Sequence, residues 1–433
     1  MRTKIKFFKL LGVGLCVMAG LLLGTMAAPS KAGASGFAVY THGAKELGMQ
    51  NNVIAHSEGP ASNYHNPALI TESKGTQIEV GTTLIFPSRE FKSAETGKTE
   101  RTESQVFYPS TLFLTHQLND RLTSGLGIFS PFGLGTDWGK DWEGEYLATN
   151  SEMQTFNINP NIGWKVNDRL SVGGGLDFLL LDATLERNIN LSRFGLPVGF
   201  PDAEQEFDGD GDGIGYNLGL VYCPNGDWSF GASYRSGIKV DVDGDAEFNL
   251  PQTTPPAIKA LLPDTGGSTE IELPAQAFFG LCYQGIDKLT VELGGRWEGW
   301  SCYEELAYKF GQPVGGTKTP PPIEKNWKDT WSYSIGTKYD LNDTLAILGG
   351  YRFDDNPVPN DTFEPAIPAS DKHAISVGVK RSIGNLVAGV SYYYEKYESR
   401  KKDTNLGASL GGTANGEYNT DAHMVSASVA YEF

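Results

Sequence analysis

Short polar turns and long loops alternate along the chain, and this arrangement limits the possible folds more than any other feature. Six turns of two or three residues are rich in Asn, Asp and Gly, which tolerate the left-handed backbone of tight hairpins. They lie at residues 119–121, 167–169, 225–227, 285–287, 342–343 and 384–385. Seven longer loops separate them, at about residues 88–106, 131–151, 183–213, 241–269, 304–328, 354–371 and 398–420. Six turns and seven loops join fourteen strands, with all short turns on one side and all long loops on the other.

The segments between these turns alternate apolar and polar residues. Within residues 228–240, Trp228 and Phe230 point to one face, whereas Ser229 and Lys239 point to the other. Side chains of a strand alternate between its two faces, so one face can meet lipid and the other an interior lumen. Alternation of this kind recurs in most of the expected strands.

A soluble β-sandwich also alternates, but it does not normally sort all its long loops to one end. The last strand ends on Phe433, and a terminal aromatic residue is typical of bacterial outer-membrane proteins. In a bilayer every backbone polar group needs a partner, which favours a closed barrel over an open sheet. The predicted fold is therefore all-β, a transmembrane 14-stranded antiparallel β-barrel of residues 76–433.

The first 34 residues have the pattern of a secretory signal peptide. Four basic residues precede an uncharged apolar stretch, which ends near the small residues Ala32, Gly33 and Ala34. Beyond this leader no apolar run approaches the roughly 20 residues of a spanning helix.

Residues 35–75 are expected to form a hatch inside the barrel. They are rich in Gly, Ala, Ser and Asn and have no clean helical or strand period. Such a segment buries too little apolar surface to fold alone. We therefore expect it to fold within the lumen and to plug it.

The composition excludes several classes of function. The 52 acidic residues outnumber the 35 basic ones, which argues against nucleic acid as a partner. Outside the leader, the three cysteines Cys223, Cys282 and Cys302 form neither a disulfide framework nor a pattern typical of zinc sites. The six histidines have no metal-binding spacing, so no metal and no cofactor are expected.

Several motifs, in order, resemble the FadL family of outer-membrane long-chain fatty acid transporters, which also includes importers of aromatic hydrocarbons. The similarity covers nearly the whole chain after the leader. The motifs are Gly36-Phe37, Asn66-Pro67-Ala68, residues 131–134 (PFGL), 155–170 (TFNINPNIGWKVNDRL), 273–300 (LPAQAFFGLCYQGIDKLTVELGGRWEGW), 326–330 (NWKDT), 356–359 (NPVP), 367–368 and 371–373.

This resemblance implies a passive transporter that consumes no nucleotide and no metal. A hydrophobic substrate would enter a groove between the long loops and pass to a tighter pocket beside the mature N-terminus, near Phe37. Movement of the hatch and an inward kink in the third strand would then allow lateral exit into the outer-membrane lipid.

Two apolar loop stretches are the predicted groove. One contains Phe194, Leu196 and Phe200, and the other contains Leu261 and Leu262. Exposed apolar clusters often mark binding surfaces, although these stretches could equally pack on each other and close the barrel mouth.

A fatty acid carboxylate in an apolar pocket needs a fixed cation. Arg187 corresponds to a pocket arginine of the family. Lys325 corresponds less closely to a pocket lysine, because its spacing to the NWKD motif is shorter here. The alternative is that each is a loop-base charge paired with Glu186 or Glu324.

Five residues are expected to control gating. Asn66, Pro67 and Ala68 can set a sharp bend before the first strand, because proline fixes its own backbone and restricts the preceding residue. Gly125 and Gly127 are candidate kink points of the third strand, or positions where the hatch backbone comes close.

Two further motifs do not indicate a site. Residues 407–411 match the GxSxG pattern of hydrolases, but they lie in a Gly-rich loop without the required strand and helix. The Asp-rich residues 208–213, expected in a loop, resemble a calcium loop but have Gly219 where a bidentate acid is needed. We expect no enzymatic activity.

The predicted function is uptake of a long-chain fatty acid by a monomer in the outer membrane. An aromatic hydrocarbon importer is the first alternative, although a neutral aromatic has no need of Arg187 or Lys325. A structural or adhesive outer-membrane protein is the second alternative, and its loops are usually more polar than these.

Overall fold

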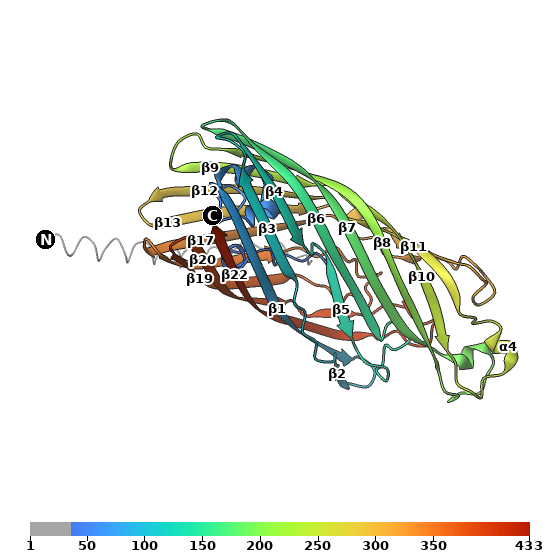
Figure 1. Cartoon of the computed structure of the whole chain (residues 1–433). Coiled ribbons are helices and arrows are strands. Elements are labelled where there is room, and N and C mark those ends of the chain that lie inside the picture. Colours follow the sequence, from blue (N-terminus) through green and yellow to red (C-terminus); the bar gives the residue numbers. More distant parts are fainter. Residues whose placement is uncertain (1–35) are drawn as a thin grey trace. The chain divides into compact units, whose positions relative to one another are not determined.

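A closed antiparallel barrel surrounds the N-terminal part of the chain in the computed structural model, which describes residues 36–433 (Figure 1). The expected signal peptide lies outside the described residues. Fourteen strand positions follow one another around the barrel. They are β1 (Thr76–Ser93), β3 (Ser110–Gln117), β4 (Leu122–Phe129) with β5 (Gly133–Asp137), β6 (Asn150–Asn167), β7 (Leu170–Ile189), β8 (Ala203–Tyr222), β9 (Trp228–Arg235) with β10 (Ile238–Asn249), β11 (Thr265–Leu273) with β12 (Gln276–Ile286), β13 (Leu289–Glu298), β17 (Thr330–Asn342), β18 (Leu345–Asp354), β19 (Lys372–Ile383), β20 (Leu386–Tyr397) and β22 (Gly416–Glu432).

The first and last strands close the barrel. β1 pairs with β22 in an uninterrupted antiparallel register from Gln77 opposite Glu432 to Ser93 opposite Gly416. The shorter strands β2 (Thr99–Arg101), β14 (Glu305–Leu306), β15 (Tyr308–Phe310), β16 (Ile323–Glu324) and β21 (Arg400–Lys402) lie between the long strands in sequence. The predicted fourteen-stranded barrel is therefore confirmed.

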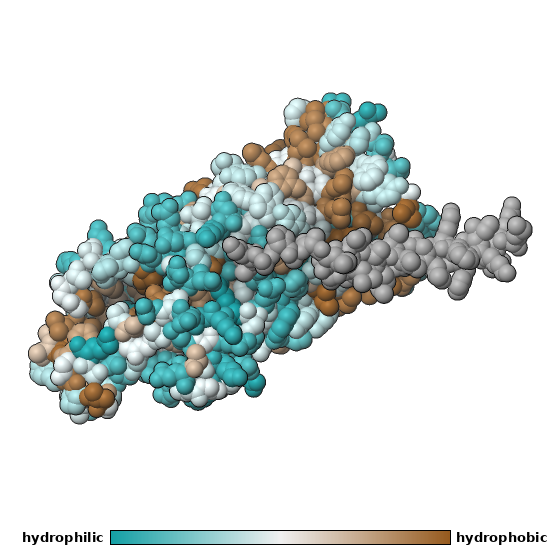
Figure 2. Space-filling model, turned by 180° about the vertical axis from the view of Figure 1, so that it is seen from behind, coloured by the Kyte–Doolittle hydropathy of each residue, from teal (hydrophilic) through white to brown (hydrophobic). Residues whose placement is uncertain are grey.

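The outer surface carries an apolar band. On β6, Phe156, Ile162 and Trp164 point outward and are about half exposed, whereas Asn157 and Asn159 point inward and are buried. Figure 2 shows apolar side chains gathered toward the end with the short turns, and mainly polar ones toward the long loops. One face of the strands is thus suited to lipid and the other to a polar lumen.

The six short turns are where the sequence predicts them, but several long loops are shorter than expected. β7 continues to Ile189 and β8 begins at Ala203, so residues 208–213 belong to a strand and not to a loop. Asp208, Asp210 and Asp212 lie in regular register with both β7 and β10. The expected position of these residues in a loop is therefore wrong.

The described helices are all short. They are α2 (Ala44–Gly48), α3 (Ser62–His65), α4 (Pro256–Lys259) and the 3-10 helices η1 (Pro67–Glu72), η2 (Leu191–Phe194) and η3 (Trp300–Cys302). In the part of the chain that the structure describes, no helix has the length and apolar character needed to cross a membrane.

Residues 36–75, here called the N-terminal segment, lie inside the barrel, and most of them are buried. Lys45 Nζ contacts Glu79 of β1 at 2.5 Å. Glu58 pairs with Lys338 of β17 and, at 2.6 Å, with Lys380 of β19. Ion pairs to separate strands of the wall hold the segment in the lumen.

Glycines of the wall make room for this segment. A Cβ at Gly231 of β9 would overlap the carbonyl oxygen of Ile54, and a Cβ at Gly173 of β7 would overlap the backbone of Pro67. Only glycine allows the two backbones to approach this closely.

One buried carboxyl of the segment makes the fold sensitive to pH. Burial, and to a smaller extent Glu79, raises the pKa of Glu46 to about 7 although Lys45 lowers it. An acid whose folded pKa exceeds its unfolded value stabilises the fold at low pH, and this contribution is lost as the pH rises through the folded pKa. We therefore expect the unfolding free energy to decrease between about pH 4.5 and pH 7.

We expect Glu46→Gln to remove this dependence. Between pH 5 and pH 8 the unfolding free energy of the unchanged protein should fall by up to about 3 kcal/mol more than that of the variant. Urea unfolding of the detergent-solubilised barrel at both pH values measures the difference. Glu95→Gln, at an exposed loop position, is the control. Equal pH slopes for both variants would contradict the assignment.

Candidate functional site

An aromatic enclosure surrounds the first described residues of the chain. Phe37 is buried, and its ring centroid lies 4.6 Å from that of Trp300, 5.6 Å from Trp327 and 6.0 Å from Tyr303. Phe132 lies on another side at 6.2 Å. The predicted pocket residue Phe37 is therefore at the centre of an apolar site.

The third strand is interrupted beside this enclosure. β4 ends at Phe129 and β5 begins at Gly133, and the residues between them form hydrogen bonds to the N-terminal segment instead. Val39 N–H donates to the Pro131 carbonyl at 2.9 Å, and Gly133 N–H donates to the Phe37 carbonyl at 2.9 Å. Pro131 has no N–H for a ladder hydrogen bond, which explains why the strand breaks here.

This break is not at the expected glycines. Gly125 and Gly127 lie within β4, in regular register with Asn161 and Asn159 of β6. A Cβ at either glycine would overlap the side chain of Asn63 in the N-terminal segment. Their position fits the alternative that the N-terminal segment comes close to the wall at these glycines. The interruption of the strand itself lies at residues 130–132.

A cavity of about 870 Å³ adjoins the break. Its walls include residues 36–41 of the N-terminal segment, residues 132–135 at the break and residues 105–110, which lead from β2 into the start of β3. Five backbone hydrogen bonds join residues 102–109 to the wall. Ile85 and Phe107 exchange two, at 2.8 and 3.0 Å, and Glu103 N–H donates to the Asp137 carbonyl at 2.8 Å. Thr83 N–H donates to the Pro109 carbonyl and Thr102 N–H to the Arg89 carbonyl, each at 3.1 Å. The cavity thus meets the wall beside the break.

Two predicted cations lie close to one carboxylate. Lys325 is buried, forms an ion pair with Glu364, and its Nζ lies 5.9 Å from the ring centroid of Tyr303. Arg187 Nε donates to Gln205 Oε1 at 2.9 Å, and Glu364 is within electrostatic range of its guanidinium. Among residues 36–433, Arg187 has no ion pair, so the group has one positive charge in excess.

The apolar loop residues extend the enclosure outward. Phe194, Leu196 and Phe200 are partly buried and pack against the same apolar cluster that contains Phe37, and Leu262 is buried within it. Leu261 is 38% exposed and lies outside the cluster. The cluster is continuous from the long loops to Phe37.

The Asn66-Pro67-Ala68 turn attaches the N-terminal segment to the wall. Asn66 Nδ2 donates to the carbonyls of Ile54, at 2.7 Å, and of Leu220 in β8, at 3.1 Å. Asn66 Oδ1 caps the 3-10 helix that begins at Pro67 by accepting from Ala68 N–H at 3.1 Å. These contacts fix the chain shortly before β1.

A second charged cluster was not predicted. Asp354 accepts from Arg296 at 2.8 Å and from Arg352 at 3.0 Å, and lies 3.7 Å from Lys372, which also pairs with Glu395 at 2.8 Å. All are buried in the lumen. The alternation along β18 could have indicated this cluster. Arg352 and Asp354 share one face of the strand, opposite the outward residues Ile347 and Tyr351.

The sequence matches one known protein family along most of its length. The family of outer membrane protein transport proteins (OMPP1/FadL/TodX) matches residues 25–433. The chain is 24% identical over 405 residues to the long-chain fatty acid transport protein of Escherichia coli O6:H1, which covers 84% of this chain and 88% of that protein.

Two solved structures share the fold. A Pseudomonas aeruginosa FadL homologue superposes with a TM-score of 0.83 and 21% identity, over 92% of this chain and 100% of the other. The Ralstonia pickettii toluene transporter TbuX gives a TM-score of 0.69 and 18% identity, over 90% of this chain and 98% of the other.

Proposed function

The chain belongs to the OMPP1/FadL/TodX family of outer membrane transport proteins, and we propose that it takes up a long-chain fatty acid. The family consists of outer-membrane transporters of hydrophobic compounds and fatty acids. The identity of the substrate is our inference, and it depends on the charges beside the aromatic enclosure.

This proposal rests on the excess positive charge at Arg187. Arg187 is partly buried and its guanidinium has no ion-pair partner among residues 36–433, so the site favours a ligand that brings one negative charge. A carboxylate satisfies the guanidinium, and an alkyl chain fits the apolar cluster that reaches from the loops to Phe37. A neutral aromatic hydrocarbon would leave Arg187 without an anionic partner.

The route follows the continuous apolar surface. The substrate would enter between the loops at Phe194, Phe200 and Leu262, with Leu261 at the entrance, and then bind beside Phe37. It would next pass through the adjoining cavity and leave sideways at the break between β4 and β5. The N-terminal segment acts as the hatch, because residues 37–39 hold that break closed through two hydrogen bonds.

Two other functions remain as alternatives. The same apolar surface accommodates an aromatic hydrocarbon, the substrate class named for the toluene transporter of similar fold. A structural or adhesive role is supported less, because Phe194, Leu196, Phe200 and Leu262 pack against the apolar cluster around Phe37 and adhesive loops are usually more polar. We propose that the protein acts as a monomer, as no described feature requires a second copy.

A binding titration distinguishes these functions. The detergent-solubilised protein is titrated with a fluorescent long-chain fatty acid, with and without toluene as a competitor. We expect saturable binding that Arg187→Ala weakens about 10- to 100-fold, the value of one charge-assisted hydrogen bond. Arg193→Ala removes an exposed arginine of the neighbouring loop and should change the affinity little.

The other outcomes are equally informative. Displacement by toluene, together with no effect of Arg187→Ala, would identify a hydrocarbon importer. No binding of either ligand to a folded, heat-modifiable barrel would exclude the transport of both and favour the structural role.

A further inference from the structure

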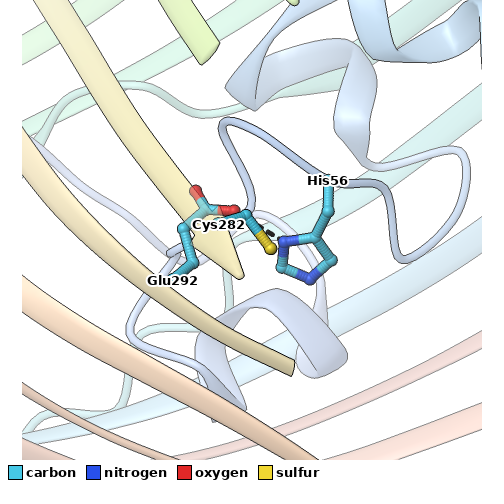
Figure 3. Close-up of side chains that lie close together, drawn as sticks. All are labelled: His56, Cys282 and Glu292. Atoms are coloured by element: carbon cyan, nitrogen blue, oxygen red, sulfur yellow. Dashed lines mark hydrogen bonds and ion pairs between the residues drawn. The ribbon is translucent and has the colours of Figure 1, made fainter. Parts of the chain in front are cut away.

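Three side chains with metal-binding atoms meet where the N-terminal segment touches the barrel wall (Figure 3). His56 comes from the segment, Cys282 from β12 and Glu292 from β13, and the two strand residues are direct partners in the β12–β13 ladder. Their ligand atoms all lie within 4.8 Å of one another. The three residues are buried, with 5% exposure for His56 and none for the other two.

Backbone hydrogen bonds hold the carboxylate in place. Glu292 Oε1 accepts from Ile54 N–H at 2.6 Å, and Ala55 N–H donates to both oxygens at 3.2 and 3.3 Å. Glu292 Oε2 lies 2.6 Å from His56 Nδ1. Both the imidazole and the carboxylate are therefore oriented before any ion arrives.

The second ring nitrogen of His56 also fits a ligating role. Among the described residues Nε2 has no hydrogen-bond partner, although it is buried, and Glu58 Oε1 lies 3.5 Å from it. Metal-ligating histidines usually donate their other N–H to a carboxylate, which fixes the tautomer. Glu58 is held by Lys338 and Lys380 and is well placed for this role.

We propose that His56 Nδ1, Cys282 Sγ and Glu292 Oε2 bind a divalent transition-metal ion of the zinc type. One nitrogen, one sulfur and one oxygen ligand, with water in a fourth position, form a tetrahedral set that suits Zn²⁺. Ca²⁺ and Mg²⁺ are disfavoured because they prefer six or more oxygen ligands. A plain His–carboxylate pair explains the position of Glu292 but gives the buried thiol no role.

Protons compete with the ion at this site. Burial lowers the pKa of His56, but hydrogen bonds to Cys282 and Glu292 outweigh it and raise the pKa well above the usual value. Binding must displace the Nδ1 proton and the thiol proton, so metal affinity should increase as the pH rises. The facing charges are Glu292, Glu58, Glu72, Lys338 and Lys380.

Metal binding would tie the N-terminal segment to the wall. The ligands come from both sides of that contact, and an ion that binds only the assembled site stabilises it by mass action. The inference does not depend on which hydrophobic substrate is carried, so its test is separate from the fatty acid titration.

Cobalt provides the experiment, because a thiolate-to-cobalt charge-transfer band reports a sulfur ligand directly. The full chain, stripped with a chelator in detergent, is titrated with Co²⁺ and then with Zn²⁺. We expect one equivalent of Co²⁺ to bind with this band, and Zn²⁺ to displace it. His56→Gln should weaken binding at least tenfold, whereas His116→Gln, at an exposed position, should not.

A variant with Cys16, Cys223 and Cys302 each replaced by Ser identifies the sulfur. It retains Cys282 as its only cysteine and should keep the charge-transfer band, while Cys282→Ser should lose it. Heat modifiability on gels checks that each barrel is folded. The proposal is overturned if the band is absent from the unchanged protein, or if it is absent from the variant that retains only Cys282.

Discussion

Oxidation of the double variant Ala38→Cys, Phe132→Cys is expected to abolish fatty acid uptake, and reduction should restore it. Residues 38 and 132 form an isolated antiparallel bridge, flanked by the hydrogen bonds Val39–Pro131 and Gly133–Phe37. Residues 38 and 132 are thus a non-hydrogen-bonded antiparallel pair. The Cα atoms of such a pair lie about 4.5 Å apart, within the range that a disulfide spans. The crosslink fixes the N-terminal segment, our proposed hatch, to the break through which the substrate would leave.

Uptake is measured by growth of a transport-deficient strain on a long-chain fatty acid, or by accumulation of labelled fatty acid. The reduced double variant controls for loss of the Phe132 ring beside Phe37, and each single variant under oxidation controls for other disulfides. Binding to the detergent-solubilised crosslinked protein should persist, because the lock affects exit and not the pocket. Full uptake by the crosslinked protein would show that the break stays closed during transport.

Asp354→Asn should have the largest effect on stability. Three buried cations surround this carboxylate, namely Arg296, Arg352 and Lys372. Removing one partner of a buried ion pair destabilises a protein by about 3–5 kcal/mol, because the remaining charge loses its compensation. Here the remaining acids, Glu298 and Glu395, cannot neutralise all three cations.

Urea unfolding of the detergent-solubilised barrel, followed by gel mobility and tryptophan fluorescence, measures this loss. Asp343→Asn, in the exposed turn between β17 and β18, is the control and should alter stability little. A decrease of less than about 1 kcal/mol for Asp354→Asn would mean that water screens the cluster, and that the lumen there is wet.

The barrel was predictable because the membrane imposes a strict pattern. Outward residues such as Ile162 and Trp164 must be apolar while their neighbours face the lumen, so β6 alternates over most of its length. The turns were predictable for a different reason, since a tight hairpin depends on local Asn, Asp and Gly residues. Both signals are local in sequence.

Strand ends beyond the apolar band were not predictable in this way. The hairpins β7–β8 and β10–β11 continue past it, and Asp208, Asp210 and Asp212 on their outer face meet water. Polar residues there are compatible with both a strand and a loop, so the acidic stretch looked like a loop. Only the pairing of neighbouring strands distinguishes the two.

The position of the candidate sites was predictable in part. The resemblance to FadL proteins predicts a site at Phe37, Arg187 and Lys325, and in the structure both Phe37 and Lys325 lie beside Tyr303. The grouping of His56 with Cys282 and Glu292 could not be predicted, because these residues are distant in sequence and meet only when the barrel closes. Likewise, the break at Pro131 depends on contacts with the N-terminal segment.

The closure of β1 on β22 imposes an order on assembly. The two strands lie at opposite ends of the barrel sequence, so the last seam cannot form until the whole chain is available. The segment that precedes β1 must already be inside when that seam forms, since a closed cylinder offers it no side entrance of comparable size. Pairing of such distant residues is entropically slow. The unassembled chain therefore needs protection from aggregation during its passage to the membrane.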